Sequence, residues 1–235
     1  GAKESINLLR QNNIPCRFIT NTTRMTKKNL VTKLQAMGLI LEVNEVFAAP
    51  HAAVEYCKNM EYTTIDLVVP DNEMEEDFID FDLHAENPQA IVLGDMGNLF
   101  TFDLLNALFK KILNGAEIVA MHKNKYWHSG NGLTLDLGAF VTALEFATEK
   151  EAVVIGKPNP HLFQLAVKPW GLSFQSIYMV GDDIKGDIGG ANNVGMQSIL
   201  VKTGKYREES LKRSEITPDF IINSVADLPE LLQLN

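Results

Sequence analysis

The sequence predicts an α/β fold, in which a doubly wound, Rossmann-like parallel sheet carries an inserted second α/β domain. Two observations support this fold class. Short apolar runs alternate with helical patterns along the 235 residues, which is typical of a parallel sheet with crossover helices on both faces. This alternation forms an outer block that stops and later resumes around a middle block. We therefore expect residues 1–49 and 148–235 to build the core domain and residues 50–147 to be the inserted domain.

The first part of the core should hold two helices and two short strands. Residues 2–12 have the apolar spacing of a helix, and the apolar residues 16–20 then predict a strand. A second helix should begin near Thr26, whose hydroxyl is a good N-cap, and should end at Gly38. Residues 43–48 predict another short strand.

The inserted domain repeats the alternation of helices and strands. We expect a helix over 52–60, strands over 65–69, 90–94 and 117–121, and an amphipathic helix that is capped by Thr101. The segment 122–137 is interpreted as a long loop that carries Tyr126 and Trp127. Loops of that length in compact domains are often functional.

The second part of the core resumes the outer block. We expect a strand over 152–156, a helix from Pro160 to about residue 169, strands over 176–180, 198–201 and 220–222, and a closing helix over 225–234.

Composition excludes several classes of partner. The net charge of −9 argues against a nucleic-acid backbone as the main partner, because the chain has no basic excess. No run of 18 apolar residues is present, so we expect no membrane span, and no basic-then-apolar signal pattern opens the chain. Cys16 and Cys57 belong to no CxxC pair and are interpreted as reduced thiols. We therefore expect a cytoplasmic protein.

An acidic stretch follows the predicted strand 176–180. Gly181 is followed directly by Asp182 and Asp183, and Asp187 comes four residues later. Ligands of open α/β sheets bind at the carboxyl edge of the strands, which is where these side chains should emerge. Mg²⁺ takes one or two protein carboxylates and completes its shell with water and phosphate oxygens. Taken alone, the stretch is equally compatible with an ordinary acidic turn.

Two other strand ends carry polar groups that suit a phosphate. Thr20 and Asn21 follow the first strand of the core, and Lys157 follows the strand 152–156. A hydroxyl, a cation and a pair of metal-binding carboxylates at one sheet edge would bind a tetrahedral phosphate. Thr20 alone would be interpreted as a turn residue, and Lys157 alone as a solvated lysine. Only their combination with the acids indicates a phosphate site.

These stretches resemble motifs of the haloacid dehalogenase superfamily of phosphohydrolases. The matching residues are 18–22 (second motif), 155–160 (third motif) and 180–187 (fourth motif). The inserted section is similar to the large α/β cap of the branch that includes NagD. Residues 201–206 and 132–136 look closest to the subgroup of phospholysine phosphohistidine inorganic pyrophosphate phosphatase and its domain-containing relatives.

The resemblance implies a Mg²⁺-dependent phosphatase that acts on a small phosphorylated compound through a phospho-aspartate intermediate. It implies that Thr20, Lys157 and Asp182 are the catalytic residues, and that Asp182 and Asp187 form the metal shell. The implied substrate-binding residues are Thr20, Asn21, Thr22, Lys157, His122 and Asn124. Members of this family often pair through their caps, so a homodimer is also expected.

The first motif of the family, Asp-x-Asp-Gly, has no counterpart in the sequence. The one Asp-x-Asp, at Asp80 and Asp82, lies in the inserted domain and is interpreted as an acidic turn; Asp95 is read as another turn residue. Without the opening strand, two inner strands of the sheet would have unpaired edges, which is costly. We therefore expect a further strand and loop of about 15 to 20 residues before Gly1.

Three alternatives remain at this stage. The chain could be a catalytically inactive module that binds phosphate or metal for regulation, which the missing nucleophile favours. A response-regulator receiver domain also combines acids with Thr and Lys, but it presents its acids first. A dinucleotide-binding domain is less compatible, because no GxGxxG follows the first strand.

Overall fold

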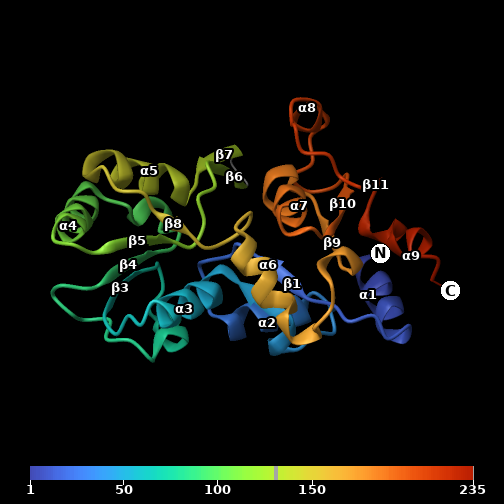
Figure 1. Cartoon of the computed structure of the whole chain (residues 1–235), viewed down its shortest axis with the longest axis horizontal. Coiled ribbons are helices and arrows are strands. Elements are labelled where there is room, and N and C mark those ends of the chain that lie inside the picture. Colours follow the sequence, from blue (N-terminus) through green and yellow to red (C-terminus); the bar gives the residue numbers. More distant parts are fainter. Residues whose placement is uncertain (130–131, 235) are drawn as a thin grey trace. The chain divides into compact units, whose positions relative to one another are not determined.

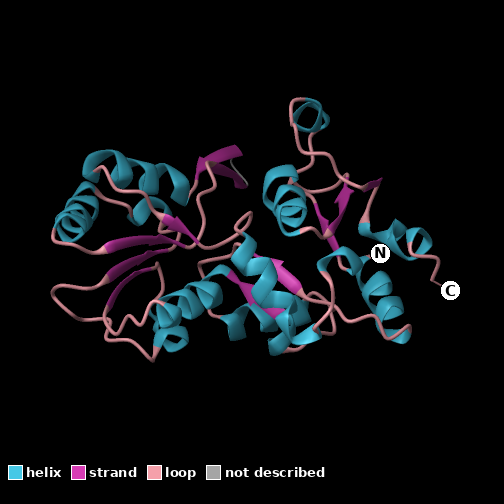
Figure 2. Ribbon diagram, viewed as in Figure 1, coloured by secondary structure: helices cyan, strands magenta, loops and turns pink. Residues whose placement is uncertain are grey.

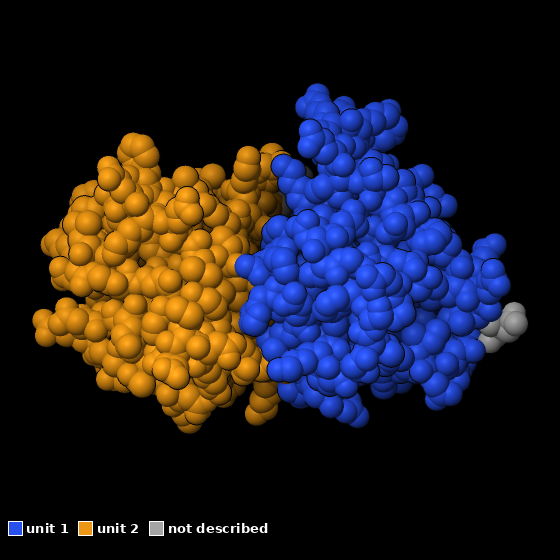
Figure 3. All heavy atoms as spheres, in the orientation of Figure 1, with its two compact units in different colours: residues 1–19, 31–47, 157–235 blue, residues 20–30, 48–156 orange. Residues whose placement is uncertain are grey.

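The computed structural model describes residues 1–129 and 132–234 and divides into two compact units. Unit 1 comprises residues 1–19, 31–47 and 157–235, and unit 2 comprises residues 20–30 and 48–156 (Figure 3). The predicted inserted domain, 50–147, lies within unit 2. The boundaries of this domain, at residues 50 and 147, stay a prediction.

The elements follow one another as strands and helices along most of the chain (Figure 1). The helices are α1 Ala2–Gln11, α2 Lys27–Ala36, α3 Ala49–Asn59, α4 Phe102–Leu113, α5 Leu137–Thr148, α6 Pro160–Val167, α7 Gly190–Val194, α8 Glu208–Lys212 and α9 Leu228–Leu231. The strands are β1 Phe18–Thr20, β2 Val46–Ala48, β3 Ile65–Val68, β4 Ala90–Leu93, β5 Glu117–Ala120, β6 Tyr126–Ser129, β7 Gly132–Leu135, β8 Val153–Val154, β9 Tyr178–Gly181, β10 Gln197–Val201 and β11 Phe220–Ile222.

In unit 1, a parallel three-stranded sheet has the order β11–β10–β9. Its register places Leu200 of β10 beside Gly181, the last residue of β9. Helices α1 and α9 pack together against the sheet through a core that contains Leu9, Ile199 and Leu228. The acids that follow β9 therefore leave a sheet whose position is fixed by a packed apolar core.

The strands β1 and β2 form a separate two-stranded sheet. The sequence pattern predicted one core sheet, but within the described residues β9 pairs only with β10 and β1 pairs only with β2.

Unit 2 contains a parallel sheet with the order β3–β4–β5–β8 (Figure 2). Helices α4 and α5 cover one face, where Leu108, Ile112 and Val141 pack on Ile91 and Ile118. The strand β8 pairs with β5, whereas the sequence analysis placed the strand 152–156 in the core. Strand pairing depends on contacts between distant residues, and an apolar run does not reveal its neighbour.

The segment 122–137 was predicted as a loop, and this prediction was wrong. Strands β6 and β7 form an antiparallel hairpin in which Tyr126 pairs with Leu135 and Trp127 with Thr134. The β-branched and aromatic side chains of this segment suit strands, and their periodicity was too short to separate a hairpin from a loop. Helix α5, which begins after Asp136, was not predicted either.

Two exclusions made from composition can be compared with the described residues. Among these residues, no helix has both the length and the apolar character needed to cross a membrane. Cys16 is half-buried, Cys57 is buried, and both are free thiols, as the sequence predicted.

Candidate functional site

The acids after β9 lie on a tight turn. Asp183 is the N-cap of a π-helical turn, Ile184–Gly189, and its Oδ1 accepts hydrogen bonds from the amides of Lys185 (3.1 Å) and Gly186 (3.0 Å). Helix α7 then continues from Gly190. Single π-helical turns are rare and occur frequently at functional sites.

Asp187 is buried and joins three parts of unit 1. Its Oδ1 forms an ion pair with Nζ of Lys157 at 2.5 Å, and its Oδ2 accepts the amide N–H groups of Asp182 and Asp183, each at 3.1 Å. A Cβ atom at Gly181 would collide with this carboxylate, so only glycine fits at the end of β9. Asp187 therefore fixes the backbone from which the two neighbouring acids project.

Asp182 has one oxygen held by backbone and one oxygen left over. Its Oδ2 accepts the amide N–H of Lys205 at 2.7 Å. Within the part of the chain that the structure describes, Oδ1 of Asp182 accepts no hydrogen bond. Gly204, with φ +56°, lies so close that a Cβ there would collide with Oδ2 of Asp182.

Asp183 is paired with Lys205, whose Nζ lies 3.1 Å from Oδ2 of Asp183. Burial raises the pKa of the Asp183 carboxyl, but the amide of Gly186 and the ammonium of Lys205 outweigh burial and hold that pKa below its ordinary value. Burial lowers the pKa of Lys205, and the neighbouring carboxylate of Asp183 more than reverses this, so the pKa of Lys205 is raised. Both groups are therefore charged near neutral pH.

We call residues 182–187 the acidic turn. Lys157 connects this turn to the end of β1. Besides its ion pair with Asp187, its Nζ donates to the carbonyl oxygen of Ile19 at 3.3 Å, and Ile19 immediately precedes Thr20 in the chain. The side chain of Lys157 is 15% exposed, so its ammonium is largely shielded from water. A shielded cation interacts more strongly with an anion than a solvated one does.

The hydroxyl groups after β1 form a compact turn in unit 2. Oγ1 of Thr20 lies 2.8 Å from Oγ1 of Thr22 and accepts the amide N–H of Thr22 at 3.1 Å. Asn21 lies against Gly156, where a Cβ would come within 2.5 Å of Oδ1 of Asn21. The turn thus gathers Thr20, Asn21 and Thr22, the three predicted phosphate-binding residues, on a single short loop.

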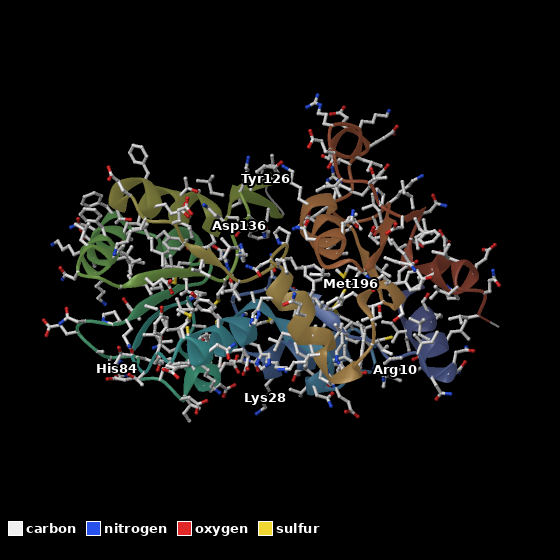
Figure 4. All side chains as sticks on the ribbon, viewed as in Figure 1. Arg10, Lys28, His84, Tyr126, Asp136 and Met196 are labelled. Atoms are coloured by element: carbon white, nitrogen blue, oxygen red, sulfur yellow. The ribbon has the colours of Figure 1, made fainter. Side chains whose placement is uncertain are left out.

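His122 and Asn124 lie at the end of β5. His122 is buried, as is Asp136, and its Nε2 is 3.7 Å from Oδ1 of Asp136. Asp136 also caps α5 (Figure 4). The amide of Asn124 donates to Nδ1 of His122 at 3.4 Å. The structure brings these two residues together, and their contact with a substrate stays a prediction.

The predicted site residues therefore form two sets. Lys157, Asp182 and Asp187 are in contact within unit 1, and the loop of Thr20 lies with His122 and Asn124 in unit 2. The meeting of the two sets around one phosphate stays a prediction.

The sequence analysis named residues 201–206 only as a likeness to a subgroup and gave Gly204 and Lys205 no role in the site. They lie in the loop that follows the strand β10, the same kind of position that indicated the acids after β9. The sequence analysis read Asp95 only as a turn residue. In the structure Asp95 is buried and forms an ion pair with Arg24 at 2.8 Å in unit 2. The Asp-x-Asp of unit 2 is a turn as predicted, with Asp80 paired to Lys58 on the surface.

The donor atoms of the acidic turn fit Mg²⁺. In residues 1–129 and 132–234, no three His, Cys, Asp or Glu side chains converge as a closed metal site. Magnesium needs no such cage, because one or two carboxylates with water and phosphate oxygens are sufficient. Oδ1 of Asp182 is the available oxygen, whereas both oxygens of Asp187 are engaged and suit a supporting role.

Two stretches of the chain match described protein families. Residues 1–84 match the family "Haloacid dehalogenase-like hydrolase", and residues 154–228 match the family "HAD-hydrolase-like". The second match contains Lys157 and all the acids of the turn.

Named relatives cover most of the chain. Haloacid dehalogenase-like hydrolase domain-containing protein 2 of Bos taurus is 38% identical over 207 residues, which are 88% of this chain and 78% of the relative. Phospholysine phosphohistidine inorganic pyrophosphate phosphatase of Homo sapiens is 32% identical over 234 residues, which are 99% of this chain and 85% of the relative.

Solved structures share the fold. The 4-nitrophenylphosphatase of Thermotoga maritima superimposes with a TM-score of 0.89 at 27% identity, covering 97% of this chain and 88% of that one. NagD from E. coli K-12 gives a TM-score of 0.85 at 20% identity, covering 97% of this chain and 90% of that one. The second likeness concerns the fold alone.

The ion pair between Asp187 and Lys157 should be important for stability. Replacing Asp187→Ala removes the anion that faces the largely shielded ammonium of Lys157, which should lower the free energy of unfolding of unit 1 by about 3 kcal/mol. The control Glu208→Ala breaks an exposed pair with Lys212 in the same unit and should cost at most about 1 kcal/mol. Urea denaturation of both variants measures the difference, and equal effects would refute the supporting role of Asp187.

The lowered pKa of Asp183 should make its contribution to stability depend on pH. Because the folded-state pKa lies below the unfolded value, the carboxylate stabilises the fold at neutral pH, and this contribution is lost as the pH falls through the folded-state pKa. Asp183→Asn should therefore destabilise the protein at neutral pH, and the difference from the unmodified chain should shrink in acid. Urea midpoints over a pH series test this, and a difference that stays constant down to strong acid would contradict it.

Proposed function

The chain belongs to the haloacid dehalogenase-like hydrolase family, and on that premise we propose that it is a Mg²⁺-dependent phosphatase for a small phosphorylated compound. The observation that carries the proposal is the contact of Lys157, Asp187 and Asp182 at the end of β9. It supplies a largely shielded cation on the carboxylate of Asp187, which also holds the backbone of Asp182, and Oδ1 of Asp182 accepts no hydrogen bond from the described residues. Those are the two kinds of group that a phosphate and its magnesium ion require.

Different residues of the chain bind the phosphate and the magnesium ion. The hydroxyl groups of Thr20 and Thr22 donate to the phosphate oxygens, together with backbone amides of the same turn. The ammonium of Lys157 neutralises negative charge on the phosphate and on the attacking carboxylate. Asp182 would hold Mg²⁺, with Asp187 fixing its backbone, and the bound ion supplies charge stabilisation to the phosphoryl group.

The covalent step requires an aspartate nucleophile. Its carboxylate oxygen attacks phosphorus, the bond from phosphorus to the leaving oxygen breaks, and water then hydrolyses the phospho-aspartate to release inorganic phosphate. Asp80 and Asp82 do not suit this role, because Asp80 pairs with Lys58 and Asp82 accepts the amide of His84. Residues 1–235 contain no Asp-x-Asp-Gly motif that would supply the nucleophile.

The substrate class rests on the phosphoryl group. Names of relatives mention phospholysine, phosphohistidine, pyrophosphate and 4-nitrophenyl phosphate, and these are the first compounds to test here. Nucleotides and sugar phosphates are the further candidates. In this proposal His122 and Asn124 contact the part of the substrate beyond the phosphate, and cap-to-cap pairing in a cytoplasmic homodimer is its expected setting.

A second candidate function is a non-catalytic phosphate- or metal-binding module. The absence of an Asp-x-Asp-Gly motif from residues 1–235 favours it. The presence of Lys157, Asp182 and Asp187 supports catalysis, because these are the residues to which the family resemblance assigns the reaction. A comparison of binding with turnover separates the two.

Phosphatase activity should depend on Mg²⁺ and on the residues of the turn. The assay uses the natural protein that contains this chain, with the four compounds named above, in the presence of Mg²⁺ or of a chelator. Asp182→Asn and Lys157→Met should each lower kcat/KM by about a hundredfold or more, because each removes charge stabilisation of the transition state. The control Asp80→Asn should leave activity unchanged.

Two results would overturn this proposal. Turnover that persists in the chelator would exclude the cation, and turnover that survives Asp182→Asn would exclude the acidic turn. Binding of inorganic phosphate with no hydrolysis of any compound would favour the non-catalytic module.

A further inference from the structure

The acidic turn carries three carboxylates, and two ammonium groups are paired with two of them. Lys157 is bound to Asp187, and Lys205 is bound to Asp183. The charge of Asp182 is left without an ammonium partner of its own in the described residues. The pairing therefore selects one of three acids as the group that is free to bind a cation.

The turn formed by Gly204 and Lys205 makes this selection through two different contacts. The backbone amide of Lys205 holds Oδ2 of Asp182 at 2.7 Å, and Oδ1 accepts no hydrogen bond from the described residues. The ammonium of the same residue holds Oδ2 of Asp183 at 3.1 Å. Gly204 permits the approach, because its φ of +56° is left-handed and a Cβ would collide with Asp182.

We propose that the turn Gly204–Lys205 determines cation selectivity, presenting one oxygen of Asp182 and withholding Asp183 from the metal. This inference rests on the proposed function, which assigns the cation to Asp182. Lys205 acts through the two acids and is a positioning residue. A low number of protein oxygens suits Mg²⁺, which keeps several waters, whereas Ca²⁺ takes six to eight oxygen ligands. Releasing Asp183 should therefore favour Ca²⁺.

The first experiment changes the ammonium and keeps the backbone. Lys205→Met frees the carboxylate of Asp183, and calorimetric titration with each ion gives the dissociation constants for Mg²⁺ and Ca²⁺. The ratio of the two constants should shift several-fold toward Ca²⁺. The matched control Lys185→Met removes an equal charge from an exposed side chain near the same acids, and should leave the ratio unchanged because both ions carry the same charge.

The second experiment tests the close approach of Gly204. Gly204→Ala introduces a Cβ that must displace the carboxylate of Asp182, and should weaken Mg²⁺ binding by about tenfold or more, as is typical when a group that orients a ligand is lost. The control Gly171→Ala has a similar φ of +62° in the same unit and no atom within 4 Å of the new Cβ. It should bind Mg²⁺ as tightly as the unmodified chain, and thermal unfolding shows whether both variants are folded.

The outcomes separate this inference from the function on which it rests. If Asp182→Asn leaves Mg²⁺ affinity unchanged, the cation is not held by Asp182, and both the proposed function and the inference fail. If Asp182→Asn abolishes binding but Lys205→Met and Gly204→Ala behave like their controls, the inference alone is overturned. Loss of Mg²⁺ preference only in Lys205→Met, and loss of affinity only in Gly204→Ala, supports it.

Discussion

The ion pair between the largely shielded Lys157 and the buried Asp187 is the interaction on which the rest of the acidic turn depends. Removing two charges from water costs several kcal/mol for each ion, and the cost is offset only when the remaining lone pairs are also satisfied. Here the second oxygen of Asp187 accepts two backbone amides, those of Asp182 and Asp183. The pair therefore orients the backbone of the turn as well as neutralising charge.

From that pair the roles of the other acids follow. Asp183 uses its carboxylate to begin the π-helical turn and to bind Lys205, so it serves the local structure. Asp182 has one oxygen fixed and one that accepts no hydrogen bond from the described residues, so it is the acid that we propose holds the cation. Neighbouring residues of identical chemistry thus have different roles, because different partners surround them.

The sequence predicted those site residues that are recognisable from a short stretch of neighbouring residues. Polar groups directly after short apolar strands indicated Lys157 and Asp182, which the structure links through Asp187 in unit 1. The meeting of Thr20 with this set stays a prediction. Sequence reasoning gave Lys205 no role, since one of its contacts uses a backbone amide that every residue except proline has and the other joins side chains 22 residues apart in the chain. It also missed the hairpin β6–β7 and assigned β8 to the wrong sheet, because strand pairing depends on residues far apart in the chain.

A direct test of the central claim is to locate the cation by paramagnetic broadening. Mn²⁺ prefers the same oxygen ligands as Mg²⁺, and it broadens amide NMR signals near its site. We expect the amides of Asp182, Asp183 and Lys205 to broaden first when a small amount of Mn²⁺ is added. Broadening that begins instead at the acidic 3₁₀ helix Asn72–Phe78 of unit 2 would contradict the account.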